Sequence, residues 1–242
     1  MRSMIRFLRN NGLGLIIVLA IFFILLRILG IEAANMFRIR ISINTILNDF
    51  IISFLRVSVT GLAAWLISIP CGYLIFHLRC LHDLFMPAIN FIRHVSPFAW
   101  FPFAIILFGL GDLSVAVIMF ITLFFPAIIA AVGIFSDVQH EYRDEALVSG
   151  ANFWQMFKLV ELPITLAAHI NLLRILWGLG WTAIIAVEML GVSQGLGFRL
   201  LDFRYLLRYQ EMILYIIIMG VTGVALDYLL RHFIRSVESK KK

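Results

Sequence analysis

Long apolar segments dominate this sequence and constrain its fold more than any other feature. Because about 20 apolar residues are needed to cross the hydrocarbon core of a bilayer, we expect a helical membrane span in each segment. The six expected spans cover residues 12–31, 50–76, 86–110, 113–135, 164–190 and 209–231. The chain is 62% hydrophobic and only 14% charged, whereas soluble domains contain about 25% charged residues. The runs do not alternate as β-barrel strands do. The sequence predicts an all-α, polytopic transmembrane bundle, with residues 1–242 forming a single domain.

The distribution of basic residues favours one orientation of this bundle. With the N-terminus in the cytoplasm, eleven Lys and Arg residues fall in cytoplasmic segments and five in external ones. Since Lys and Arg are enriched on the cytoplasmic side, we expect both termini there. Arg2, Arg6 and Arg9 also resemble the start of a secretory signal peptide, but we interpret the segment that follows as a retained span. The formal net charge of +6 then indicates contact with membrane lipids, and no nucleic-acid partner.

Sequence patterns for several kinds of active site are missing. The six histidines show no metal-binding spacing, so we expect no metal site. There is no Gly-x-x-x-x-Gly-Lys-Ser/Thr run for binding the phosphates of ATP. No Ser/His/Asp or Cys/His set converges on one face. We therefore expect a non-enzymatic membrane protein, with a membrane enzyme as the least favoured alternative.

The expected cytoplasmic loop at 136–162 has a composition of its own. It is charged and permits helix formation, and its apolar residues are spaced along it. This pattern predicts two short helices at the membrane surface, separated at Gly150 because glycine accepts a positive φ at little cost. Pro163 would then restart the chain as the first turn of the fifth span. A passive interfacial connector remains the alternative.

The run Asp144-Glu145-Ala146, followed by Gly150 and by Leu162-Pro163, resembles the EAA loop of permease subunits in ATP-binding-cassette (ABC) importers. The glycine and the Leu-Pro pair match in spacing, whereas Asp144 and Glu145 stand where Glu and Ala are usual. Other motifs follow in the order found in the nitrate, sulfonate and taurine subgroup. These are Ser53-x-x-Arg56, Arg93-x-x-x-Pro97-x-x-x-x-Pro102, Phe108-Gly109-x-Gly111, Phe124-Phe125-Pro126, Trp181, Ala186-x-Glu188-Met189 and Gly195-Leu196-Gly197.

This resemblance implies a permease subunit in the bacterial cytoplasmic membrane. It implies a second copy of the permease, two ATPase subunits that bind ATP and Mg, and an extracytoplasmic substrate-binding protein; this chain itself would hold no cofactor. The solute would be a small anion such as nitrate, a sulfonate, taurine or bicarbonate. The residues expected to contact the ATPase, or to transmit its movement, are Asp144, Glu145, Ala146, Gly150, Ala151, Phe153, Leu162 and Pro163.

One stripe of the fifth span carries residues that are unusual in lipid. At 100° per residue, Arg174, Trp177, Trp181 and Glu188 fall within about 60° of one another. A lipid-facing stripe would not carry both an arginine and a glutamate, so we expect it to face the bundle interior or a translocation pathway. Arg174 and Glu188 lie about 21 Å apart along the axis and cannot pair with each other. Buried pairing with other helices is the alternative to a pathway lining.

A second pathway segment is expected in the third span. Pro97 and Pro102 should interrupt the helix and free backbone carbonyls, which membranes tolerate only beside protein or a water-filled cavity. An ordinary kink is the alternative. The expected pathway residues here are Arg93, His94, Pro97, Trp100 and Phe101.

Two further arginines lie near the external ends of their spans. We expect Arg27 and Arg56 to extend to lipid headgroups as structural residues.

Among possible functions, an ion-gradient-driven secondary transporter or channel is the main alternative to a permease. Such proteins more often have ten or more spans or repeated halves, and we find no convincing internal repeat.

Overall fold

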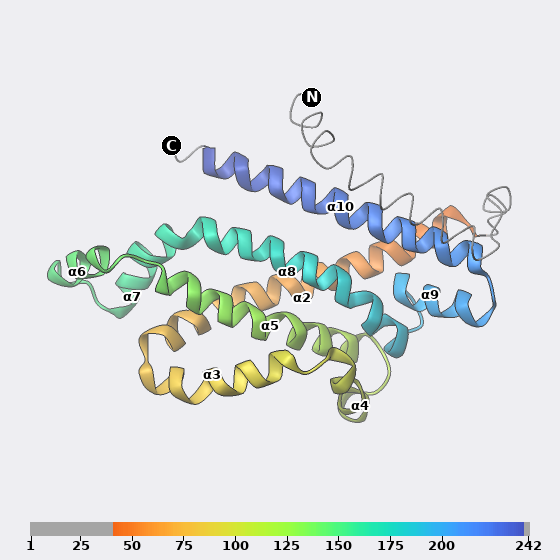
Figure 1. Ribbon diagram of the computed structural model, residues 1–242, viewed down its shortest axis with the longest axis horizontal. Coiled ribbons are helices and arrows are strands. Elements are labelled where there is room, and N and C mark those ends of the chain that lie inside the picture. Colours follow the sequence, from red (N-terminus) through yellow and green to blue (C-terminus); the bar gives the residue numbers. More distant parts are fainter. Residues whose placement is uncertain (1–40, 240–242) are drawn as a thin grey trace.

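The computed structural model describes residues 41–239 of the chain, and in that range it contains helices and no strands. Four long helices form the body of the molecule (Figure 1): α2 (Ile43–His77), α5 (Asp112–Ser136), α8 (Leu162–Gly191) and α10 (Tyr209–Ser239). The shorter elements are α3 (Arg79–His94), α4 (Pro97–Phe108), α6 (His140–Val148), α7 (Phe153–Gln155), the π-helix η2 (Met156–Glu161) and α9 (Leu196–Tyr205). In Figure 1, α6 and α7 lie at one end of the long helices and α9 lies toward the other.

The long helices have the length and hydropathy expected of membrane spans. Four helices are long and apolar enough to cross a membrane, or five if α3 and α4 together form one span. They correspond to the second, fourth, fifth and sixth expected spans; α5 matches its predicted boundaries to within one residue, whereas α2, the Phe153–Gly191 helix and α10 extend several residues beyond theirs at one or both ends. The expected first span, with Arg27, lies outside the described residues. The all-α, multi-pass prediction therefore holds for the part of the chain described.

The third expected span, over 86–110, is interrupted as its prolines predicted. The chain forms α3 and α4, which are bent by 99° relative to each other, and α3 begins earlier than expected, at Arg79. The residue before a proline is pushed away from helical ψ, and Ser96 has a ψ of 140°. Pro97 then takes a first-turn position of α4, where its missing N–H costs nothing. Pro102 stays inside α4, so Pro97 alone explains the break.

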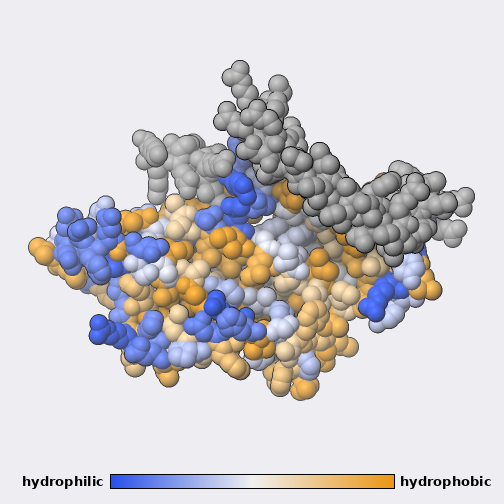
Figure 2. Space-filling view, in the orientation of Figure 1, coloured by the Kyte–Doolittle hydropathy of each residue, from blue (hydrophilic) through white to orange (hydrophobic). Residues whose placement is uncertain are grey.

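The core lies where α2, α5 and α8 pack together. Several fully buried positions in this contact are small or medium in size, including Val57, Ala64, Leu123 and Ala127. Close packing of small residues stabilises helix contacts in lipid, where no hydrophobic force drives helices together. Hydrophobic residues also cover the body of the molecule in Figure 2, whereas hydrophilic residues gather at the end that carries α6. Smaller hydrophilic patches lie along the lower edge and at the opposite end of this view, so the largest polar region is the end that carries α6.

Candidate functional site

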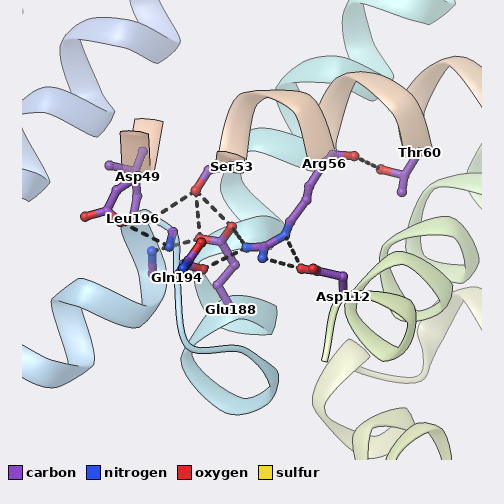
Figure 3. Close-up of polar contacts among 10 residues, drawn as sticks. Asp49, Ser53, Arg56, Thr60, Asp112, Glu188, Gln194 and Leu196 are labelled. Atoms are coloured by element: carbon purple, nitrogen blue, oxygen red, sulfur yellow. Dashed lines mark hydrogen bonds and ion pairs between the residues drawn. The ribbon is translucent and has the colours of Figure 1, made fainter. Parts of the chain in front are cut away.

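A buried polar cluster lies where α8 ends and the chain turns into α9 (Figure 3). Its centre is Glu188, whose side chain is fully buried. Arg56 Nη1 donates to Glu188 Oε1 at 2.6 Å, and Ser53 Oγ lies 2.8 Å from both carboxylate oxygens. The backbone N–H of Gly197 donates to Glu188 Oε2 at 2.9 Å. A carboxylate would be costly to bury alone, and these donors offset much of that cost.

The two glycines of the Gly195-Leu196-Gly197 motif make room for this carboxylate. A Cβ added at Gly195 would lie 2.5 Å from Glu188 Oε1, and one added at Gly197 would lie 2.3 Å from the Ile185 carbonyl oxygen. Gly195 also has a φ of +117°, a conformation that residues with a side chain rarely adopt. Both positions therefore need glycine for close approach of the loop to α8.

The same cluster extends to α9 and α10 through Asp49. Its carboxylate accepts from Arg199 Nε at 3.0 Å and from the Tyr215 hydroxyl at 2.9 Å. The Gly195 N–H points at the other oxygen, at 3.4 Å. Asp49, Ser53 and Arg56 are spaced along one face of α2, so a single helix face binds the end of α8, the loop, α9 and α10. We call residues Asp49, Ser53, Arg56, Asp112, Glu188 and the backbone of 194–197 the Glu188 cluster.

The expected role of Arg56 as a snorkelling residue is wrong. Its side chain is only 13% exposed and pairs with Glu188 and with Asp112. Helix α2 begins at Ile43, earlier than expected, so Arg56 lies well inside it. Its guanidinium therefore meets the carboxylates of α8 and α5 before it can reach headgroups. The Ser53-x-x-Arg56 spacing, which puts both side chains on one helix face, was the signal available in the sequence.

Three residues of the expected stripe of α8 are buried, Trp177, Trp181 and Glu188, whereas Arg174 is partly exposed. Trp177 and Trp181 stack with ring centroids 5.2 Å apart, and both belong to the central apolar cluster with Phe101. Arg174 pairs with Asp227 at 2.7 Å, and Arg174 and Glu188 indeed have separate partners. These contacts agree with the buried-pairing alternative. A pathway role for the stripe remains a prediction.

The other expected pathway residues do not join this stripe, apart from Phe101. Arg93 and His94 are exposed at the end of α3, and Pro97 and Trp100 are partly buried at the start of α4. The 99° bend between the two helices separates these groups. Phe101 therefore belongs to the same central apolar cluster as Trp177 and Trp181, whereas Arg93 and His94 are exposed.

At the opposite end, the loop has the predicted first helix and the predicted turn. Helix α6 ends at Val148, and Gly150 has a φ of +78°. Asn152 then caps α7 in a reciprocal capping box with Gln155. Asp144 and Glu145 are exposed, whereas Ala146 and Ala151 are partly buried. The Phe153 ring lies 4.9 Å from that of Tyr73.

Pro163 lies in the first turn of α8, as expected, but the second short helix is not separate from that span. The chain is helical without a break from Phe153 to Gly191, because η2 joins α7 to α8. Proline supplies no N–H and its ring clashes with the preceding turn. The helix accommodates Pro163 by widening the preceding turn to a π-turn, in which the Leu162 N–H donates to the Phe157 carbonyl, five residues back. Leu162 is partly buried and Pro163 is exposed on this continuous helix.

Comparison with known proteins agrees with this architecture. Residues 64–239 match the family described as binding-protein-dependent transport system inner membrane component. The chain is 32% identical over 189 residues to a putative ABC transporter permease protein of Methanocaldococcus jannaschii, covering 78% of this chain and 71% of that protein. It is 31% identical over 187 residues to a nitrate import permease protein of Synechocystis, covering 77% of this chain and 66% of the relative.

A solved structure shares the fold. The MetNI methionine ABC transporter, in an inward-facing conformation, gives a TM-score of 0.70 at 16% identity and covers 78% of this chain and 94% of that chain. The chain belongs to the family of binding-protein-dependent transport system inner membrane components. The predicted class, a non-enzymatic permease of the ABC type, is confirmed by this match.

Proposed function

We propose that two copies of this chain form the translocation path of an ATP-driven importer in the bacterial cytoplasmic membrane. Two ATPase subunits would bind ATP and Mg and dock on the α6 loop, and an extracytoplasmic protein would deliver the solute. The family match and the shared fold with an ABC transporter support the class. The ABC permeases similar to this chain include a nitrate importer, which supports a small anion as the solute.

The observation that carries this proposal is the surface of α6. It lies at the end of the long helices, and hydrophilic residues surround it (Figures 1 and 2). Yet Leu147 is 60% exposed and Val148 is 91% exposed, next to exposed Asp144 and Glu145. Apolar residues beside carboxylates on a short exposed helix suit a groove in a second protein. Gly150 fixes the direction in which the chain leaves this helix.

The test of the proposal is the composition and activity of the purified complex. Expressed with its ATPase and solubilised in mild detergent, the chain should purify as two permeases with two ATPases. In liposomes, uptake should require both ATP and the ATPase. Uptake by the permease alone, driven by an ion gradient at a comparable rate, would instead establish the secondary-transporter alternative.

The orientation is tested separately by single cysteines. In a background with Cys71 and Cys80 replaced by serine, Ser136→Cys and Gln139→Cys should react with an impermeant maleimide only from the cytoplasmic side. Ser193→Cys should react only from the external side. All three positions are exposed in the structure, so failure to react reports sidedness and not burial. The reverse labelling pattern would place α6 outside and exclude its docking role.

A further inference from the structure

A second buried ionic cluster lies beneath α6, and none of its charged residues belongs to the predicted loop motif. It consists of Arg143 on α6, His77 near the end of α2, Glu161 in η2 and the carbonyl of Phe135 near the end of α5. Arg143 is 8% exposed and Glu161 is fully buried. We call this set the Arg143 cluster. It joins one exposed helix to three elements of the bundle.

Arg143 forms the centre of this junction. Its Nε donates to Glu161 Oε1 at 2.5 Å and its Nη2 donates to the Phe135 carbonyl at 2.5 Å. The guanidinium carbon also lies 4.9 Å from the centre of the Phe76 ring. Because the guanidinium is planar and its donors have fixed directions, bonds to two acceptors set the orientation of the side chain. A rotation or shift of α6 would therefore strain contacts to α2, α5 and η2 together.

The end of α2 contacts the chain on the far side of the Gly150 turn from Arg143. His77 Nε2 lies 3.2 Å from Glu161 Oε1, and its Nδ1 lies 3.2 Å from the Tyr73 carbonyl. The Tyr73 hydroxyl donates to the Phe153 carbonyl at 2.9 Å. Arg143 thus attaches the segment before the turn, and Tyr73 attaches the segment after it.

The exposed and buried residues of α6 have separate positions. Asp144, Glu145, Leu147 and Val148 are exposed, whereas Arg143 is buried against the bundle. A partner can therefore contact the exposed residues without touching the Arg143 cluster. Removing one member of a buried ion pair is strongly unfavourable, since it leaves the other charge uncompensated. The cluster consequently resists separation of α6 from the spanning helices.

We propose that Arg143 is a positioning residue that transmits movement of α6 to α2, α5 and α8 through Glu161, His77 and Phe135. The inference rests on the proposed docking of an ATPase at α6. Apolar contacts can slide past one another, whereas the directed bonds of Arg143 hold α6 in one register. Movement of the docked helix then displaces the ends of three spanning segments at once.

The test compares Arg143→Gln and Arg143→Lys with the wild type in the complete complex in liposomes. Both variants should keep the ATPase bound, because the exposed residues of α6 are unchanged. Solute taken up per ATP hydrolysed should fall by about tenfold in Arg143→Gln, within the range typical of coupling between sites. Arg143→Lys, which keeps the charge but loses the two-acceptor geometry, should also be impaired. Arg79→Gln, at an exposed arginine near the end of the same bundle, is the matched control and should couple normally.

Two outcomes separate this role from simple stabilisation. A purely structural Arg143 would lower the yield of complex while the remaining molecules coupled normally, and a normal ratio of uptake to ATP hydrolysis in Arg143→Gln or Arg143→Lys would overturn the inference. The reversed pair Arg143→Glu with Glu161→Arg should recover coupling relative to either single change. If the wild-type chain fails to bind an ATPase at all, the proposed function fails instead.

Discussion

Replacing Gly197 with alanine should prevent most of the chain from accumulating in folded form. The added Cβ would lie 2.3 Å from the Ile185 carbonyl oxygen and 2.9 Å from Glu188 Cβ, so backbone must move. Overpacking alone costs about 1–3 kcal/mol. The displaced Gly197 N–H would also leave the buried Glu188 carboxylate, and a hydrogen bond to a charged group contributes about 1.5–3 kcal/mol. Together these losses, about 2.5–6 kcal/mol, reach the lower end of the about 5–15 kcal/mol that keeps a typical protein folded.

The measurement for Gly197→Ala is the amount of chain in membranes and its thermal unfolding temperature in detergent. Gly178→Ala is the matched control, because Gly178 lies in α8 and an added Cβ there meets nothing within 4 Å. The control should be as stable as the wild type. Equal yield and equal unfolding temperature for Gly197→Ala would show that the loop is not held against Glu188 as described.

Gly150→Val is expected to abolish most uptake while leaving the spanning helices intact. Gly150 has a φ of +78°, and an added Cβ would meet nothing within 4 Å. The substitution therefore acts through the backbone alone. A left-handed conformation costs about 1–2 kcal/mol for an ordinary residue, and a β-branched residue tolerates it worst. The turn should change shape, and α6 should lose its direction relative to α7.

The readout for Gly150→Val is ATP-driven uptake and stimulated ATP hydrolysis, normalised to the ATPase retained on the membrane. Gly150→Asn is the matched control, since asparagine accepts the left-handed conformation more readily. Uptake should fall by about tenfold or more with valine and remain substantial with asparagine; a loss of 1–2 kcal/mol corresponds to a factor of about 5–30. If valine at 150 and Glu145→Arg both leave uptake and hydrolysis normal, the loop is only a connector.

Features that depend on short stretches of sequence were predictable. The apolar runs identified α2, α5, α8 and α10 as long membrane helices, because the length of a span follows from bilayer thickness. Gly150 and Pro97 marked a turn and a break for reasons confined to their own backbone. The stripe on α8 identified Glu188 and Arg174 as residues that need partners inside the protein.

Local reasoning failed where two backbone preferences competed. Pro163 does lie in the first turn of α8, but the helix before it was expected to be separate, and the chain keeps it continuous with α8 by widening one turn into η2. The choice depends on burial of Phe157 and Glu161 against the bundle, which keeps this segment in helical contact. The backbone preferences of proline describe an isolated chain, whereas here packing against the bundle accounts for the continuous helix from Phe153 to Gly191.

From the sequence alone it follows that this chain is a helical membrane protein, where most of its helices lie and which residues are too polar to face lipid. The partners of those residues emerge only in the folded chain: Arg56 and Ser53 for Glu188, and Glu161 for Arg143. Ser53 and Glu188 are 135 residues apart in the chain. Their meeting depends on the rotation and register of α2 against α8, which many small packing contacts set together. Hydropathy and turn preferences act over a few neighbouring residues and carry no information about that register.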